Sequence, residues 1–179
     1  MQADLSPVIA ATAQWLTHAY PASGGALASA FCEVQARQAV TVAARLRYPT
    51  AMDAALMGMA GPGGSARLDW ITGADGNPAT DPDVDAWRTW VDEVVASWAA
   101  CLLTDPELAA LAVAALADGG STSGTPSGTP VEFRRLLAPD DRDRRAAALL
   151  RHPDLVAPVA ELHHAQLVDR LGPGRSLVA

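Results

Sequence analysis

Alanine and leucine dominate this chain of 179 residues, and their excess is the strongest constraint on its fold. The sequence holds 38 Ala and 20 Leu but only 2 Ile. Ala and Leu lead the helix-propensity scale, whereas β-branched Ile favours strands. The composition therefore predicts an all-α fold, and the length predicts a single domain over residues 1–179.

Proline and glycine mark where the expected helices begin and end. Ser6 is expected to cap the first helix, with Pro7 in its first turn. Thr50 and Asp53 have the spacing of a capping box at the start of a third helix. These signals predict a bundle of seven or eight helices, over residues 6–20, 25–48, 50–61, 81–103, 105–118, 129–137, 139–152 and 158–171.

Two Gly-rich loops, residues 61–80 and 119–130, are expected to interrupt the bundle. Five Gly and two Pro in the first loop argue against a helix there, and we expect at most a brief extended piece over 68–72. This loop carries Arg67 and Trp70, so Trp70 is expected either to plug the bundle or to anchor a partner. The second loop has the composition of a flexible linker and is the candidate subdomain boundary.

Two helices are expected to be central. Residues 105–118 follow a capping box formed by Thr104 and Glu107, and positions 108–117 are apolar on every side, which predicts burial in the core or against a partner. Within residues 81–103, apolar side chains recur at steps of three and four, as on one seam of a packed helix. The members of this seam are Val84, Trp87, Val91, Val94, Trp98 and Cys101.

The charged residues exclude several classes of chemistry. Lysine is absent, so the chain has no amine for a Schiff base, a pyridoxal phosphate anchor or a phosphate-binding P-loop. All 13 basic residues are Arg, and 20 acidic residues give a net charge of −7. This acidic balance argues against general binding to nucleic acid.

Nothing in the sequence predicts insertion into a membrane or export. No apolar run reaches the length of about 18 residues that a membrane span needs, and the first residues lack the basic region of a signal peptide. Cys32 and Cys101 lie among small apolar residues and are expected to be buried free thiols, with a disulfide between them as the alternative. A cytoplasmic location is the resulting expectation.

Metal and catalytic motifs are incomplete. The spacing of Asp81, Asp83 and Asp85 resembles a calcium loop, but Ala86 stands where such a loop needs Gly. Glu161 and His164 have the spacing of half a di-iron site, with no second half. We therefore expect no metal and no cofactor. The weak candidates for acid–base catalysis are His18, Glu33, Glu161, His163 and His164.

Six of the 13 Arg residues lie within eighteen positions. Because the guanidinium group binds phosphate and carboxylate with two parallel hydrogen bonds, the cluster predicts a site for an anion or an acidic partner. The alternative is a solvated helix face with local pairs such as Asp141–Arg145. The cluster comprises Arg134, Arg135, Arg142, Arg144, Arg145 and Arg151.

These features favour a protein-interaction component over an enzyme. The hypothesis is an adaptor, assembly or regulatory partner that acts through the apolar helix at 105–118 and the Arg-rich segment, by binding another protein or by self-association. The alternative is a small cytosolic enzyme or ligand-binding protein whose His and Glu side chains face a cavity in the bundle.

Overall fold

In a computed structural model of the chain, the residues described are 4–74, 85–119 and 131–172. This part of the chain is all α-helical, as the composition predicts, and contains no strand. Eight of its ten α-helices have seven residues or more, in agreement with the expected seven or eight. In chain order the elements are α1 Ser6–Ala19, α2 Gly25–Arg47, α3 Ala51–Ala60, α4 Ala66–Thr72, the 3₁₀ helix η1 Ala86–Trp90, α5 Glu93–Thr104, α6 Pro106–Gly119, α7 Arg134–Leu137, α8 Asp141–Ala146, α9 Pro153–Ala160 and α10 His164–Leu171.

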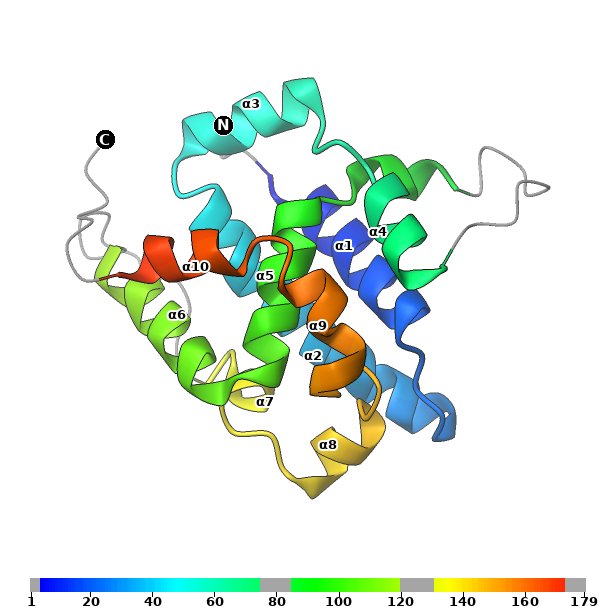
Figure 1. The fold of residues 1–179 in the computed structure, drawn as a ribbon. Coiled ribbons are helices and arrows are strands. Elements are labelled where there is room, and N and C mark those ends of the chain that lie inside the picture. The colour runs from blue at the N-terminus through cyan, green and yellow to red at the C-terminus, as the bar shows by residue number, and fades with distance from the viewer. Residues whose placement is uncertain (1–3, 75–84, 120–130, 173–179) are drawn as a thin grey trace.

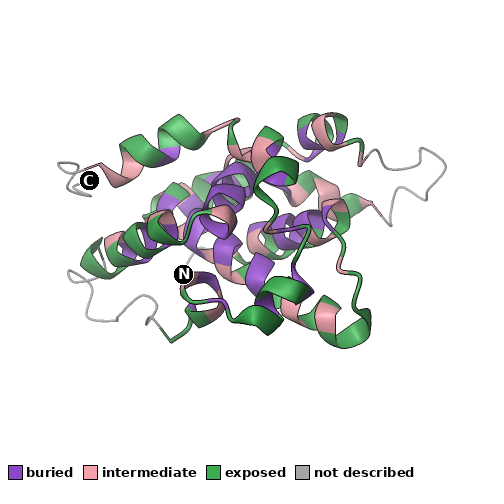
Figure 2. Ribbon diagram, turned by 60° about the horizontal axis from the view of Figure 1, so that its bottom comes forward, coloured by how far each residue is buried: buried purple, intermediate pink, exposed green. Residues whose placement is uncertain are grey.

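Helices α2 and α5 form the centre of the molecule (Figure 1). Every residue of α5 from Val95 to Leu103 is buried, because α1, α2, α6 and α9 surround it. The purple residues in Figure 2 accordingly concentrate in the middle of the bundle. Cys32 on α2 and Cys101 on α5 are buried free thiols, as expected.

The single helix expected over 81–103 is divided at Asp92. Trp87 lies in η1, Val91 is extended, and α5 begins only at Glu93. The Asp92 carboxylate accepts a hydrogen bond from the Val95 amide at 3.0 Å, which caps α5 and stops the helix from extending backward. The predicted seam of six residues is therefore not one helix face; its first member, Val84, and the aspartates at 81 and 83 lie outside the described residues.

The expectation that residues 61–80 contain no helix is wrong over residues 66–72, where α4 forms. Its glycines flank the helix and do not interrupt it: Gly64 precedes α4 and Gly73 ends it in the left-handed conformation. Asp69 fixes α4 to α1, because its carboxylate accepts hydrogen bonds from the Trp15 indole and the Ser65 hydroxyl, both at 2.7 Å. The rest of that loop, residues 75–80, lies outside the described part.

Helix α6 is not buried on every side, contrary to the expectation for residues 108–117. It buries Ala109, Ala112, Val113 and Leu116 against α2, α5 and α7. Its opposite side is exposed because α6 lies at the edge of the bundle, and Leu111 is 61% exposed there. Two expected caps also shift by one residue: Leu5 replaces Ser6 at α1, and Asp105 replaces Thr104 at α6.

The C-terminal part has shorter helices than expected. One helix is predicted over residues 139–152, but α8 ends at Ala146 and so occupies only the first half of that range. The predicted last helix over 158–171 is two helices, and Pro158 lies inside the first, α9. Proline is tolerated there because it removes only the hydrogen bond to the carbonyl of Asp154, a residue of the exposed first turn.

The helices that precede and follow residues 119–130 share one apolar core. Phe133, Leu136, Leu150 and Val156 from the later segment belong to the same buried cluster as the side chains of α2 and α5. Residues 120–130, including the expected helix start at 129–130, lie outside the described part. No helix within the described ranges is long and apolar enough to cross a membrane.

Candidate functional site

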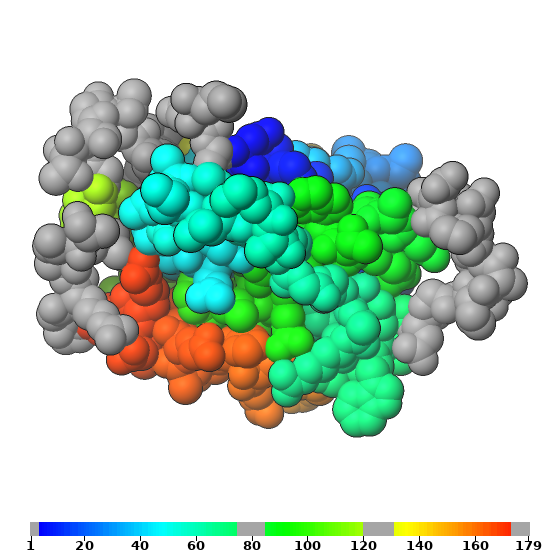
Figure 3. All heavy atoms as spheres, turned by 90° about the horizontal axis from the view of Figure 1, so that it is seen from above, coloured from blue at the N-terminus to red at the C-terminus, as the bar shows by residue number. Residues whose placement is uncertain are grey.

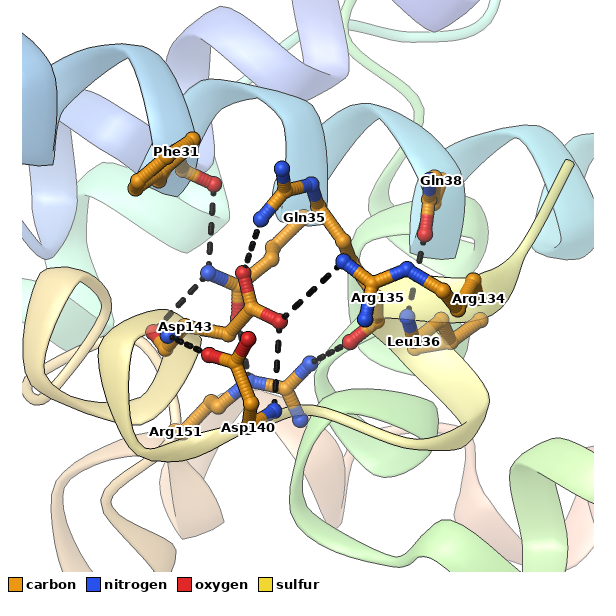
Figure 4. A network of polar contacts seen from close by, with 9 residues as sticks. All are labelled: Phe31, Gln35, Gln38, Arg134, Arg135, Leu136, Asp140, Asp143 and Arg151. Atoms are coloured by element: carbon orange, nitrogen blue, oxygen red, sulfur yellow. Dashed lines mark hydrogen bonds and ion pairs between the residues drawn. The ribbon is translucent and has the colours of Figure 1, made fainter.

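Two members of the predicted Arg cluster are used inside the fold. Figure 4 shows Asp143 of α8 at the centre of a polar network that joins α7 and α8 to α2. Asp143 is fully buried and forms an ion pair with Arg135. The amide group of the Gln35 side chain donates to the Asp143 carbonyl at 2.9 Å, so this aspartate is tied through both its side chain and its backbone.

Arg151 belongs to the same network and donates three hydrogen bonds within it. Its Nε donates to Gln35 Oε1 at 2.5 Å, and its terminal nitrogens donate to the carbonyls of Leu103 at 2.9 Å and Arg135 at 2.8 Å. Burial lowers the pKa of Arg151 to about 10, and the nearby Asp143 opposes that shift. Arg135 and Arg151 therefore hold the bundle together and are not free to bind an external anion.

The other four Arg side chains of the cluster are exposed. Arg134 lies 3.9 Å from Asp143 with 51% of its side chain exposed. Arg144 pairs loosely with Asp141 at 4.0 Å, in place of the expected Asp141–Arg145 pair. An anionic partner would have Arg134, Arg142, Arg144 and Arg145 available, and binding by these four stays a prediction.

A hollow with a volume of about 460 Å³ lies between α3 and the adjoining ends of α2 and α5. We call it the α3 groove. Figure 3 looks down on α3, which lies across this face of the molecule. The groove is lined by Arg47, Tyr48, Asp53, Leu56, Met57, Ala60, Gly61, Pro62, Asp92, Glu93 and Val94.

The lining of the α3 groove includes a hydrogen-bonded tyrosine–aspartate pair. The Tyr48 hydroxyl donates to Asp92 Oδ2, and Asp92 is 3% exposed. Burial, followed by this hydrogen bond, raises the pKa of Tyr48 well above its usual value, so the phenol stays neutral. The Asp92 backbone amide donates to the Thr12 hydroxyl at 3.2 Å. The pair is therefore anchored to both α5 and α1.

Glu93 connects three parts of the chain beside the groove. Its Oε1 lies 2.7 Å from His163 Nε2 and accepts a hydrogen bond from Arg67 at 3.1 Å. His163 is the residue before α10, and Arg67 belongs to α4. A carboxylate beside an imidazole is an arrangement that supports acid–base chemistry, and the His163 ring is partly exposed.

The other predicted catalytic residues do not join this pair. His18 lies against the Trp87 ring, with centroids 5.6 Å apart, and Glu33 pairs with Arg37 at 3.8 Å on the surface. Glu161 and His164 are exposed. Of the five candidates, His163 alone meets a second ionisable group of the site, Glu93.

Sequence reasoning did not identify Tyr48, Asp92 or Glu93. Glu93 and His163 are 70 residues apart in the chain, and Tyr48 and Asp92 are 44 apart, so no local spacing connects them. The available signal was the Asp92-Glu93 pair within an apolar stretch, which is typical of a helix N-terminus.

Trp70 and Arg67 both lie on α4, but only Arg67 forms an ion pair within the fold. Trp70 is 78% exposed, so it does not fill a gap in the bundle. Arg67 is used in the ion pair with Glu93, although 60% of its side chain stays exposed. Trp70 is thus the one of the two that remains available as an anchor for a partner.

The described residues include no group of three or more His, Cys, Asp or Glu side chains placed to hold a metal ion. Comparison with known proteins adds no assignment: no protein-family model, no curated protein and no solved structure matches this chain.

Proposed function

We propose that this chain is a helical protein-interaction component whose main contact surface is the outward face of α3. Met52, Leu56 and Met59 are 67%, 53% and 77% exposed. Their spacing of four and three residues places them on one side of the helix. A row of exposed large apolar side chains on one helix is the observation that carries the proposal, because monomeric proteins rarely leave such a row uncovered.

The outward face of α3 is also uncharged. Asp53 is the only charged residue of the helix, and it is used in the capping box with Thr50. The remaining exposed positions are small: Ala51, Ala55, Gly58 and Ala60. Small residues let another helix approach closely, and Met side chains adapt to the shape of a partner.

Helix α3 stands apart from the rest of the bundle (Figure 1). Only Ala54 and Met57 of its ten residues are buried. A short helix that buries so little of its surface in its own fold gains stability by packing against something else. This supports α3, more than α6, as the docking helix, since Leu111 is the only large apolar side chain of α6 that is strongly exposed.

The exposed Trp70 offers an additional contact for a partner. The exposed arginines of α7 and α8 lie at the other end of the bundle from α3 (Figure 1), so they would serve a second contact surface. The enzyme hypothesis takes second place, because His18, Glu33 and His163 each have separate partners. The proposal keeps the cytoplasmic expectation, which two buried free thiols support.

A photo-crosslinking amino acid placed at position 59, in cells that make the protein naturally, tests the proposal. We expect a discrete covalent adduct from position 59 and none from position 27, because Leu27 is a comparably exposed helical residue, 63%, on another face. The adduct partner is then identified by mass spectrometry, and its binding to the purified protein is measured directly.

Met59→Lys should abolish that binding, whereas Leu27→Lys should leave it unchanged. Self-association is measured in parallel by sedimentation over a range of concentrations, since the partner can be a second copy of the chain. Failure of position 59 to give an adduct, in a protein that also stays monomeric, would refute the proposed surface.

A further inference from the structure

We infer that the exposed arginines of α7 and α8 form a docking surface for a short acidic segment of a partner protein, with Arg142 and Arg145 as the main contacts. The other two members of this surface are Arg134 and Arg144. It lies at the opposite end of the bundle from α3 (Figure 1), so it is separate from the contact surface proposed above.

The charge of the chain is unevenly distributed, and its positive part lies in this region. Residues 134–151 hold six Arg and three Asp, which gives a net charge of +3. The rest of the sequence holds seven Arg and seventeen acidic residues, which gives a net charge of −10. An acidic partner is therefore attracted to α7 and α8 and repelled by the remainder of the chain, which favours one orientation of approach.

Arg142 and Arg145 are the two arginines of α8 that the fold does not use. Both are exposed, and neither side chain forms an ion pair or a hydrogen bond with another residue of the described part. They are three positions apart on the helix, so the two guanidinium groups are neighbours, at a spacing where like charges repel. A carboxylate from outside the fold would relieve this repulsion.

Arg134 and Arg144 add two guanidinium groups that are only loosely paired. Arg134 lies 3.9 Å from Asp143, and Arg144 lies 4.0 Å from Asp141, both at the outer limit of an ion pair. The buried network around Asp143 holds α7, α8 and α2 together. The backbone that carries the four arginines is therefore ordered before a partner binds, which lowers the entropic cost of binding.

The guanidinium groups and a neighbouring leucine indicate the chemistry of the partner. A guanidinium group binds a carboxylate through two parallel hydrogen bonds. Carboxylates on alternate residues of an extended segment, or three to four residues apart in a helix, have about the separation of Arg142 and Arg145. Leu149, four residues after Arg145, is 40% exposed and offers an apolar contact. A segment that combines Glu or Asp with an apolar residue therefore fits this surface.

A protein segment fits better than a nucleic acid. A nucleic acid carries negative charge all along its backbone, so its binding would bring further phosphates toward the acidic remainder of the chain. A short acidic segment carries only the few charges that the arginines can pair. The exposed Leu149 also suits an apolar side chain better than a sugar–phosphate backbone.

Titration of the full chain with the peptide acetyl-Glu-Glu-Leu-Glu-Glu-Leu-amide, followed by amide chemical shifts in ¹H–¹⁵N spectra at constant pH and ionic strength, measures the binding. We expect saturable shifts at Arg142, Arg145 and Leu149 and none at Met59. The matched neutral peptide has Gln in place of every Glu and should give no saturable shift. Binding of the acidic peptide should weaken when the ionic strength rises from about 50 to about 300 mM, because salt screens exposed charge pairs.

Substitutions test the arginines directly. Arg142→Ala and Arg145→Ala should each weaken peptide binding about threefold and together about tenfold, as expected for exposed charge pairs. Arg67→Ala is the matched control, because Arg67 is an exposed arginine of α4, and it should bind the peptide as the wild type does. Met59→Lys should also leave peptide binding unchanged, so this proposal and the α3 proposal fail independently.

The proposal is overturned if the neutral peptide binds as well as the acidic one, if the double variant binds as the wild type does, or if no shift saturates. Inorganic phosphate or oligothymidylate that produces the same shifts at a lower concentration would assign the surface to a phosphate ligand and overturn it as well. Shifts at Arg142 and Arg145 that follow protein concentration alone would assign it to a second copy of the chain, with the same consequence.

Discussion

Among single residues, Asp143 joins three helices through one buried side chain and its backbone. It is fully buried, and its ion pair with Arg135 and its contact with Gln35 join α8 to α7 and α2. Asp143→Ala would leave Arg135 without its buried partner, which typically costs about 3–5 kcal/mol of stability. We expect a loss of that size in the free energy of unfolding, measured by urea denaturation.

Asp141, two residues earlier on the same helix, is the matched control. Its side chain is 86% exposed and lies 4.0 Å from Arg144, a geometry worth less than about 1 kcal/mol. Asp141→Ala should therefore shift the urea midpoint only slightly. Equal effects of the two substitutions would mean that the buried network contributes no more than a surface pair.

Cys101 should lower the stability of the fold at alkaline pH. Burial raises the pKa of its thiol from 9.0 to about 11. The unfolded chain therefore loses this proton at a lower pH than the folded chain, so the free energy of unfolding falls as the pH rises from about 9 to about 11. A shift of two pKa units corresponds to at most about 3 kcal/mol.

Urea denaturation of the wild type and Cys101→Ala at pH 8 and pH 10.5 measures this contribution. The variant should lose less stability between the two pH values than the wild type. Some dependence should persist in both proteins, because burial also raises the pKa of Tyr20 and Cys32. An identical loss in both proteins would show that Cys101 does not contribute.

Among the secondary-structure elements, α3 and α8 both begin with a capping box but differ in how much they pack against the bundle. Each has a capping box, formed by Thr50 and Asp53 at α3 and by Asp140 and Asp143 at α8. Loss of a cap costs about 1 kcal/mol. Because α3 packs little against the bundle, Thr50→Ala should accelerate hydrogen exchange in α3 and leave the global unfolding midpoint unchanged.

Asp140→Ala provides the contrast. Helix α8 packs on α2 through the buried network, so a weaker start to this helix should lower the global unfolding midpoint. Hydrogen exchange measured by mass spectrometry, together with urea denaturation, distinguishes the two responses. A global loss from Thr50→Ala would mean that α3 unfolds together with the core.

The elements that sequence reasoning predicted correctly are those set by local chemistry. The Thr50–Asp53 cap is an interaction across three residues, and the structure confirms it. Helix α4 is not predicted because five Gly and two Pro lie within residues 61–80, although residues 65–72 themselves contain neither. Asp92 was overlooked inside an apolar seam whose period suggested one continuous helix.

The candidate site was less accessible to prediction than the fold. His163 was among the catalytic candidates, but its partner Glu93 comes from a different helix 70 residues away. Such a pair depends on how α5 packs against the turn between α9 and α10, which helix spacing does not determine. The contacts of Arg151 were inaccessible for a similar reason, because Gln35 lies 116 residues away in the chain. Arg135 pairs with Asp143 of the next helix, and helix spacing within one element does not predict that contact either.

At the scale of the whole molecule, the two segments of the chain that flank residues 120–130 depend on one core. The later segment contributes Phe133, Leu136 and Val159 to the same buried cluster as α2 and α5. Residues 1–119 alone would expose the faces of α2 and α5 that these side chains cover. We therefore expect this fragment to lose cooperative unfolding, measured by circular dichroism during heating.

Cleavage within residues 120–130 of the folded protein breaks the chain but leaves both segments present. It therefore distinguishes the effect of the broken chain from the effect of removing the later segment. A protease site inserted between Gly124 and Thr125 allows the full chain to fold before it is cut. The nicked protein should stay associated and retain its helical signal, because Arg151 still bonds to Gln35 and to Leu103 across the cut. If residues 1–119 instead unfold cooperatively on their own, residues 131–172 are an accessory subdomain and the core is complete without them.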